Sequence, residues 1–451
     1  LKLRRFKKIF GSFNIQKVIS NTGYIIDLQT LEQTKISKNK NKKNYHRIRK
    51  TIEIKPKKVK RSLSNNYKPS VTIKAIPEDF KNHINIVNKE IDSIKRCKKC
   101  ILTKTMPFIE FDASGVCNFC RNYKSYNVAD IEVLKNIIES KVIRTKDPNS
   151  VMAVSGGRDS CFGLHYAVKV LGLKPIAYTY DWGLITDLAR RNTSRMVSAL
   201  GIEHILISAD IKQKRNFLRK KVLTWLKRPK LGLIPLFQSG DKQYFYYLKK
   251  VMSENNLSFT LFTENPLEKT NFKTGFAGVF EGNNKKSRVF DISLFNKIKL
   301  GYYFSKEFLL NPAHLNSSIF DTFGGYLSSF FIKHDWDFLY QYYKWNEDEV
   351  NKVLKNDYDW ETPDDTTDTW RIGDWNAPFY NYIYYVVAGF TENDTFRSNQ
   401  VREGLITRKR ALQMVKIHNQ PRWESLISYC NIIGVDFNNT IKVINGIAKK
   451  Y

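Results

Sequence analysis

The sequence has no run of about 18 consecutive apolar residues, so we expect no membrane-spanning helix. Its first residues, LKLRRFKKIF, are too short and too charged for a secretory signal peptide. They also do not begin with Met, so the natural start could lie upstream. We therefore expect a cytoplasmic protein.

Cysteine is scarce, and four of the six cysteines stand in two CxxC pairs separated by sixteen residues. Two CxxC turns can present four thiolates to one Zn²⁺ in a tetrahedron, which leaves no open position for catalysis. The sequence therefore predicts a structural zinc site, with a redox role for one pair as the alternative. The predicted ligands are Cys97, Cys100, Cys117 and Cys120.

Acidic residues are also few: the chain has 43 of them against 75 Lys and Arg, and a formal net charge of +32. The imbalance is strongest in residues 1–70, with 20 basic and 3 acidic side chains. Such an arm can bind nucleic acid, an anionic membrane surface or acidic partners, or can simply be a solvated Lys-rich segment. Within it, apolar runs on both sides of Asn21-Thr22-Gly23 predict a β-hairpin, followed by a basic linker over 34–70.

Short apolar strands alternate with helices between residues 126 and 300. Strands are predicted at 150–154, 174–182, 204–208 and 259–266, and helices at 128–143, 186–201 and 211–228. This alternation predicts an α/β fold with a doubly wound parallel sheet, whose ligands bind at the C-terminal strand ends. The predicted parts are a basic arm (1–75), a zinc segment (90–125), the α/β domain (126–300) and a mainly helical region (301–451).

The sequence SGGRDS follows the strand at 150–154 and opens a helix. Two glycines let the backbone approach a phosphate, and a helix start supplies free N–H groups. Hydroxyl donors and an Arg side chain add to such a site, and an Asp beside phosphate suggests a Mg²⁺ ligand. The predicted nucleotide-binding residues are Ser155, Gly156, Gly157, Arg158, Asp159 and Ser160, of which Arg158, Asp159 and Ser160 are the catalytic candidates.

SGGRDS resembles the SGGxDS loop of the PP-loop ATP pyrophosphatases, which cut ATP between its α- and β-phosphates and adenylate an oxygen of the substrate. This resemblance implies ATP and Mg²⁺ as cofactors. It also implies that Asp181, which ends the second strand with Trp182, borders the nucleotide. Glu264 in TENP would share the metal with Asp159, although turn-stabilising roles for Asp181 and Glu264 remain open.

Two branches of that superfamily carry paired CxxC motifs before the loop. The segments PFIEFDASGVCNFCRNY, TENP, YKWNEDEV, WETP and SNQVREGLITRKRAL look like the N-acetyl sugar amidotransferases of surface-polysaccharide (lipopolysaccharide, O-antigen) biosynthesis over residues 95–435. Arg158 stands where that family commonly has Lys. The other branch, tRNA thiolation enzymes, suits the basic composition but needs further sulfur-handling cysteines, and here only Cys161 and Cys430 remain. A non-catalytic nucleic-acid-binding protein is a third hypothesis, so nucleic acid is not expected but could bind through the arm.

The resemblance implies an amidotransferase that adenylates a sugar N-acetyl oxygen and replaces it with ammonia-derived nitrogen. It implies a nucleotide-sugar substrate, a separate glutaminase subunit and, in addition, a cyclase-like channel subunit. Arginines and amides of the C-terminal region suit phosphates or a carboxylate, although each could equally form a surface ion pair. The substrate candidates are Arg371, Arg397, Asn399, Gln400 and Arg402, with Asp368 and Asp374 in the same motifs.

Overall fold

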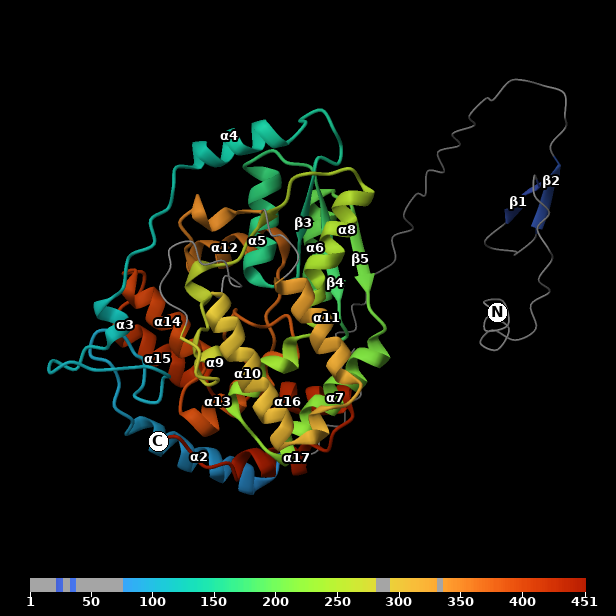
Figure 1. Cartoon of the computed structure of the whole chain (residues 1–451). Coiled ribbons are helices and arrows are strands. Elements are labelled where there is room, and N and C mark those ends of the chain that lie inside the picture. Colours follow the sequence, from blue (N-terminus) through green and yellow to red (C-terminus); the bar gives the residue numbers. More distant parts are fainter. Residues whose placement is uncertain (1–21, 27–32, 38–75, 281–292, 331–335) are drawn as a thin grey trace, which may run out of the picture. The chain divides into compact units, whose positions relative to one another are not determined.

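Figure 1 shows a computed structural model, which describes residues 22–26, 33–37, 76–280, 293–330 and 336–451. The chain divides into two compact units, Leu1–Pro69 and Ser70–Tyr451. In the first, β1 (Thr22–Ile26) pairs antiparallel with β2 (Gln33–Ser37). The predicted turn at Asn21-Thr22-Gly23 is wrong, because Thr22 and Gly23 pair inside β1. The predicted linker likewise starts too early, and from residue 38 to 75 it lies outside the described residues.

The second unit is built around parallel strands (Figure 1). β3 (Ser150–Ala153), β4 (Pro175–Asp181) and β5 (His204–Ser208) form one sheet with β4 in the middle. β6 (Leu261–Phe262) and β7 (Asp337–Phe338) form a second parallel pair, and one parallel bridge from Val151 to Thr260 links the two sheets. The α/β class with parallel strands is confirmed for the described residues, whereas a continuous doubly wound sheet is not shown.

Helices cover both faces of the three-stranded sheet. Successive strand residues point to opposite faces, so they belong alternately to two different cores. One face packs against α5 (Arg158–Lys169) and α6 (Asp187–Leu200), and its core includes Met152, Val154, Ala177, Cys161, Leu164 and Met196. The other face packs against α8 (Tyr244–Glu254), and its core includes Val151, Ile176, Tyr178, Phe245, Leu248 and Val251. The C-terminal strand ends therefore emerge between two layers of helices.

The remaining elements enclose this centre. Before β3 lie α2 (Glu78–Asp92), α3 (Asn118–Arg121) and α4 (Ile131–Lys141). Between β5 and β6 lie α7 (Ile211–Lys227), η1 (Leu231–Gln238) and η2 (Asp241–Gln243), and after β6 come η3 (Pro266–Glu268) and α9 (Phe272–Gly275). The C-terminal region is mainly helical, as predicted: α10 (Leu294–Leu310), η4 (Pro312–His314), α11 (Ser318–Phe330), η5 (Leu339–Gln341), α12 (Glu347–Tyr358), α13 (Asn376–Ala388), α14 (Glu392–Arg402), α15 (Arg408–His418), α16 (Trp423–Ile433) and α17 (Phe437–Asn445). None of the described helices has the length and apolar content that crossing a bilayer requires.

The structure confirms the predicted helix α6, and both of its ends show caps. The Thr186 hydroxyl accepts a hydrogen bond from the Ala189 N–H, and Gly201 ends the helix in the left-handed region with φ of 66°. The first turn of α6 lies against the glycine loop that follows β3. A Cβ on Gly156, whose φ is 74°, would stand 2.1 Å from the Ala189 carbonyl oxygen. Gly156 is thus required both by its backbone conformation and by the close approach of α6.

We predict that Gly156→Ala is much more destabilising than Gly201→Ala. Both replacements place a Cβ on a left-handed residue, which costs about 1 kcal/mol. At Gly201 nothing lies within 4 Å of the new Cβ, whereas at Gly156 the clash with backbone atoms adds about 2 kcal/mol or more. Urea unfolding of the two variants measures the difference, and equal losses of stability would contradict the close contact between the loop and α6.

Candidate functional site

The glycine loop forms an open cradle at the start of α5. Ser155 is exposed, its hydroxyl lies 3.1 Å from that of Ser160, and the Ser155 N–H donates to the same Ser160 oxygen. A Cβ on Gly157, the N-cap residue, would crowd the Ser155 hydroxyl at 3.3 Å. The first N–H groups of α5 have no partner within the helix. This combination of hydroxyls and helix start is suited to bind an anion, and phosphate above all.

Arg158 does not point into this cradle. Its side chain is buried, and its guanidinium donates to Glu347 at 2.7 Å and to Thr369 at 2.9 Å. It also contacts Asp159 at 3.2 Å and lies over the Trp345 ring. Burial opposes the charge, but these carboxylates outweigh it and raise the pKa of Arg158. We predicted a charged fork facing phosphate; the structure instead places Arg158 as the buried link between the loop and α12.

Asp159 faces a second carboxylate that the sequence analysis missed. Trp345 donates its indole N–H to Asp159 at 2.8 Å, and burial of Asp159 is outweighed by Arg158, which lowers the pKa of Asp159. Burial, and then the charge of Asp159, raise the pKa of Glu268 well above its usual value. Two negative charges at these positions repel each other, and a divalent cation between the carboxylates would relieve that repulsion.

Further carboxylates gather at the same edge of the sheet. Burial raises the pKa of Glu264, which follows β6, and of Asp241 in η2. Burial and then the charge of Asp241 raise the pKa of Asp374 to about 7. The positive charge of Arg371 acts on all three of these carboxyl groups and lowers the pKa of each. The backbone of Arg371 lies in the left-handed region, with φ of 56°. Glu264 thus lies in the cluster, while the carboxylate directly beside Asp159 is Glu268.

A buried ion pair continues this cluster into the C-terminal helices. The Lys273 ammonium lies 2.6 Å from the Glu392 carboxylate and 4.1 Å from the centre of the Tyr380 ring. Burial lowers the pKa of Lys273 to about 8, although Glu392 opposes this effect. For Glu392, Lys273 and Arg371 outweigh burial and lower the pKa to about 2. Sequence analysis missed Lys273 and Glu392 because no motif marks them, and only the fold brings them to Arg371.

The hydrogen-bond and ion-pair partners of Asp181 are close in the sequence. Its carboxylate accepts from the Gly183 N–H at 2.8 Å and pairs with Arg190 of α6 at 2.7 Å. Trp182 is buried. Both residues stand at the C-terminal end of β4, as predicted, but Asp181 stabilises the turn and the start of α6. Its predicted contact with the nucleotide stays a prediction.

The five predicted substrate residues do not converge on one place. Arg371 lies in the carboxylate cluster. Arg397 is fully buried, pairs with Glu347 and Asp368, and donates to Gln400 at 2.7 Å. Together with Glu347, Arg397 and Gln400 line a separate cavity of about 540 Å³ between α12, α14 and α15. Asn399 and Arg402 contact each other, and Arg402 extends toward the cysteines.

The four predicted zinc ligands do come together. Cys97, Cys100, Cys117 and Cys120 are buried, and all four sulfurs lie within 4.8 Å of one another. The Cys97–Cys120 and Cys100–Cys117 Sγ distances are 3.9 and 3.8 Å. A tetrahedron with Zn–S bonds of about 2.3 Å has edges of about 3.8 Å, so the cluster fits one zinc ion. The identity of the metal remains a prediction.

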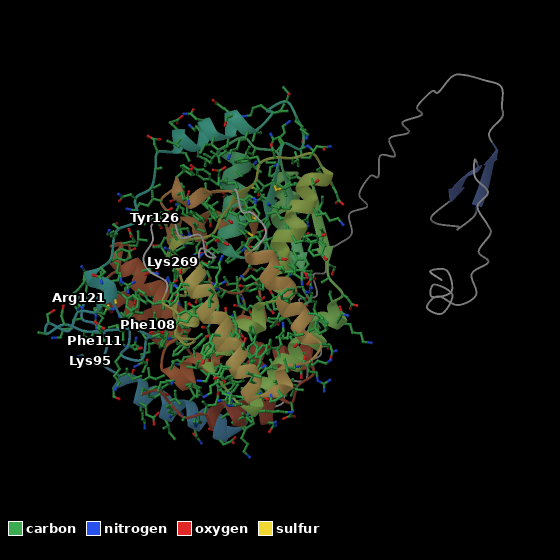
Figure 2. All side chains as sticks on the ribbon, in the orientation of Figure 1. Lys95, Phe108, Phe111, Arg121, Tyr126 and Lys269 are labelled. Carbon is green, nitrogen blue, oxygen red and sulfur yellow. The ribbon has the colours of Figure 1, made fainter. Side chains whose placement is uncertain are left out.

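A basic side chain contacts the thiols of this cysteine cluster, and further basic and aromatic side chains belong to the same segment. Figure 2 labels Lys95, Phe108, Phe111 and Arg121 together at one edge of the view, and the Lys95 ammonium lies 4.8 Å from the Phe111 ring centre. Arg402 reaches the sulfurs from α14, with its guanidinium 3.4 Å from Cys120 Sγ and 3.5 Å from Cys100 Sγ. Four thiolates with one Zn²⁺ carry a net negative charge, which the Arg402 guanidinium offsets.

Arg402 also connects the cysteine cluster to the carboxylates. It donates to the Asn399 side chain at 2.5 Å, and Asn399 donates to the Leu267 carbonyl at 2.7 Å. Leu267 immediately precedes Glu268 in η3. Asn399 and Arg402, which we predicted as substrate ligands, are therefore placed as supports between the cysteines and η3.

No family model matches the sequence, and no curated protein matches it. Among solved structures, an NMN synthetase from Francisella tularensis is 14% identical, covers 62% of this chain and 93% of its own, and gives a TM-score of 0.24. The U34-tRNA thiolase NcsA from Methanococcus maripaludis with its [4Fe-4S] cluster is also 14% identical. Its match covers 72% of this chain and 91% of its own, with a TM-score of 0.26. At these TM-scores neither likeness supports an argument, so the site is interpreted from its own geometry.

We predict that Cys100→Ser abolishes stoichiometric metal binding and lowers the melting temperature sharply. Removal of one thiolate breaks a closed tetrahedral site, and structural zinc contributes directly to folding stability. Elemental analysis of protein purified without chelators gives the metal content. Cys430→Ser is the matched control, because Cys430 is equally buried but lies outside the cluster. Unchanged zinc content in Cys100→Ser would rule out the four-thiolate site.

We predict that Asp374 makes the protein less stable as the pH rises from about 4 to about 7. Its folded-state pKa is about 7, above the usual 3.8, so within this window the unfolded state loses the proton first. Below the window both states are protonated and Asp374 has no effect. Asp374→Asn keeps the acceptor for the Asn376 N–H, so its melting temperature should fall less over this window than that of the unmodified protein. Parallel pH profiles of the two proteins would exclude a raised pKa.

Proposed function

We propose that the protein is an ATP-dependent, AMP-forming amidotransferase acting on an N-acetylated sugar. The observation that carries this proposal is the juxtaposition of an open phosphate cradle with a carboxylate cluster at the same strand ends. Adenylation needs these two elements, one to hold the pyrophosphate and one to hold a cation beside it. The similarity of the chain's motifs to sugar amidotransferases supports the choice of substrate.

Different side chains of the site would have different roles in the proposed reaction. The Ser155 and Ser160 hydroxyls and the first N–H groups of α5 would bind the pyrophosphate portion of ATP. Asp159 and Glu268 would hold Mg²⁺, with Glu264 near enough to the cluster to contribute. The cation would neutralise phosphate charge as the bond between the α- and β-phosphates breaks. Arg158, held by Glu347, would keep the start of α5 in place rather than touch the nucleotide.

In the proposed reaction the amide oxygen of the sugar N-acetyl group attacks the α-phosphorus of ATP, and pyrophosphate leaves. Ammonia then adds to the activated carbon, and AMP departs with the former amide oxygen. The product carries an acetamidino group, in which NH has replaced oxygen. Arg371 would stabilise the negative charge of the adenylate, because its positive charge already acts on the surrounding carboxylates Glu264 and Asp374.

The nitrogen source we propose is a separate glutaminase subunit, with a cyclase-like subunit to conduct the ammonia. Cys161 and Cys430 are both fully buried, and burial raises the pKa of each thiol to about 12. Neither thiol is therefore available to attack glutamine. A nucleotide sugar destined for lipopolysaccharide, O-antigen or a related surface glycan is the proposed substrate.

The test is pyrophosphate release from ATP and Mg²⁺, with ammonium chloride and a panel of N-acetylated nucleotide sugars or bulk tRNA. We expect release with one sugar, together with a product about one mass unit lighter, because NH replaces oxygen. Ser155→Ala and Asp159→Asn should each lower the rate by about 100-fold or more, because each removes a ligand of transition-state charge. Ser140→Ala, at an exposed serine of α4, is the control and should retain full activity.

Pyrophosphate release with tRNA alone would refute the sugar amidotransferase and favour a thiolation enzyme. An Asp159→Asn protein that folds normally yet releases pyrophosphate at the original rate would refute the proposed metal site.

A further inference from the structure

The outer surfaces of α10, η4 and α11 expose an unusual number of large apolar side chains. Leu309 and Phe320 are both 76% exposed, and nine neighbours are also accessible. We call the following set the apolar face: Leu294, Phe295, Ile298, Tyr302, Leu309, Leu310, Leu315, Phe320, Phe323, Tyr326 and Leu327. In Figure 1, α10 and α11 (yellow to orange) both run across the side of the second unit that faces the viewer.

The apolar face has the spacing of helix surfaces that pack against another helix. On α10 the exposed residues recur every four positions, at Leu294, Ile298 and Tyr302. On α11 they are spaced by three and then four positions, at Phe320, Phe323 and Leu327. Soluble helices normally turn such stripes inward. On α11 the inward surface is instead largely polar, whereas α10 also packs Tyr303, Phe304 and Phe308 against the core.

The acidic groups of both helices are turned inward and paired. Glu307 of α10 is buried against Arg228, and Asp321 of α11 is buried between Lys214 and Lys221. Within the described part of α10 and α11, no carboxylate is exposed among the apolar side chains. The exposed charges of these two helices are Lys299 and Lys306, both on α10. Large apolar side chains therefore dominate the face.

The size of this face matches one half of a protein interface. Exposed aromatic and aliphatic side chains of this number present roughly 1,000 Å² of apolar surface, since one aromatic side chain alone can bury 150–250 Å². The largest patch on a typical monomer is about 300–600 Å². A standard dimer contact takes about 800 Å² from each partner, with an apolar centre and a polar rim.

We propose that a second copy of this chain docks on the apolar face, so that α10 and α11 of two protomers pack together. A membrane surface fits less well, because α11 has no Lys or Arg in Ser318–Phe330 to meet anionic headgroups. A two-fold contact pairs the apolar side chains of one copy with the same side chains of the other. This inference does not depend on the proposed function.

The contact would also hold a helix that supports the candidate site. A Cβ on Gly325 of α11 would stand 2.0 Å from the Ser239 carbonyl oxygen, so α11 packs backbone to backbone on the segment before η2. Asp241 and Lys242 in η2 act on the carboxylate cluster. Pairing of two copies would therefore restrain η2 through α11.

The experiment is the solution mass of the full chain by light scattering during gel filtration at micromolar concentration. We expect twice the chain's 52.8 kDa. Phe320→Glu with Phe323→Glu should give a monomer, because two buried charges weaken the contact by about 100-fold or more. Tyr302→Glu on α10 tests the second helix independently. Ile143→Glu, at a 68% exposed position after α4, is the matched control and should remain dimeric.

A monomeric parent protein would overturn the proposal, as would a dimer whose mass both variants on the apolar face leave unchanged. Vesicles of phosphatidylglycerol and phosphatidylcholine serve as the second probe. A monomer that sediments with them through Phe320 and Phe323 would assign the face to a membrane instead. Circular dichroism of each variant confirms that a change in mass is not a loss of folding.

Discussion

The buried ion pair between Arg158 and Glu347 is the constraint on which the candidate site depends. A guanidinium at the residue directly after the loop glycines cannot be left in an apolar interior without partners. Glu347, Asp159 and Thr369 satisfy it, and Arg397 satisfies the other side of Glu347. Since these partners come from α12, α14 and the segment before α13, the ion pair ties the glycine loop to the C-terminal region. The loop is consequently a property of the whole second unit.

Features set by neighbouring residues could be predicted from the sequence. The SGGRDS turn, the capped helix α6 and the cysteine cluster each carry a signal in nearby residues, namely paired glycines, a Thr cap and two CxxC pairs. The hairpin register failed for the opposite reason. Asn21-Thr22-Gly23 has the composition of a turn, but pairing with Lys35 and Ile36 keeps Gly23 and Tyr24 inside a strand. Tertiary pairing overrode a local preference.

Features set by distant residues could not be predicted. The direction of Arg158 depends on Glu347, 189 positions away. The choice of carboxylate beside Asp159 depends on η3, where the Asn265 side chain accepts from the Leu267 N–H and Pro266 starts the turn. That turn brings Glu268 to Asp159, while Glu264 remains nearer Tyr244. The sequence TENPLE contains both glutamates, and nothing in their spacing alone selects between them.

The long-range origin of the loop's support has a consequence for how the protein is made. Ribosomes release a chain from its N-terminus, so Ser155 to Ser160 emerge well before Glu347 and Arg397. Until those partners have been synthesised, the Arg158 charge has no buried counterpart and α5 cannot settle on the sheet in its final position. The glycine loop thus takes its final form only after Glu347 and Arg397 have been synthesised.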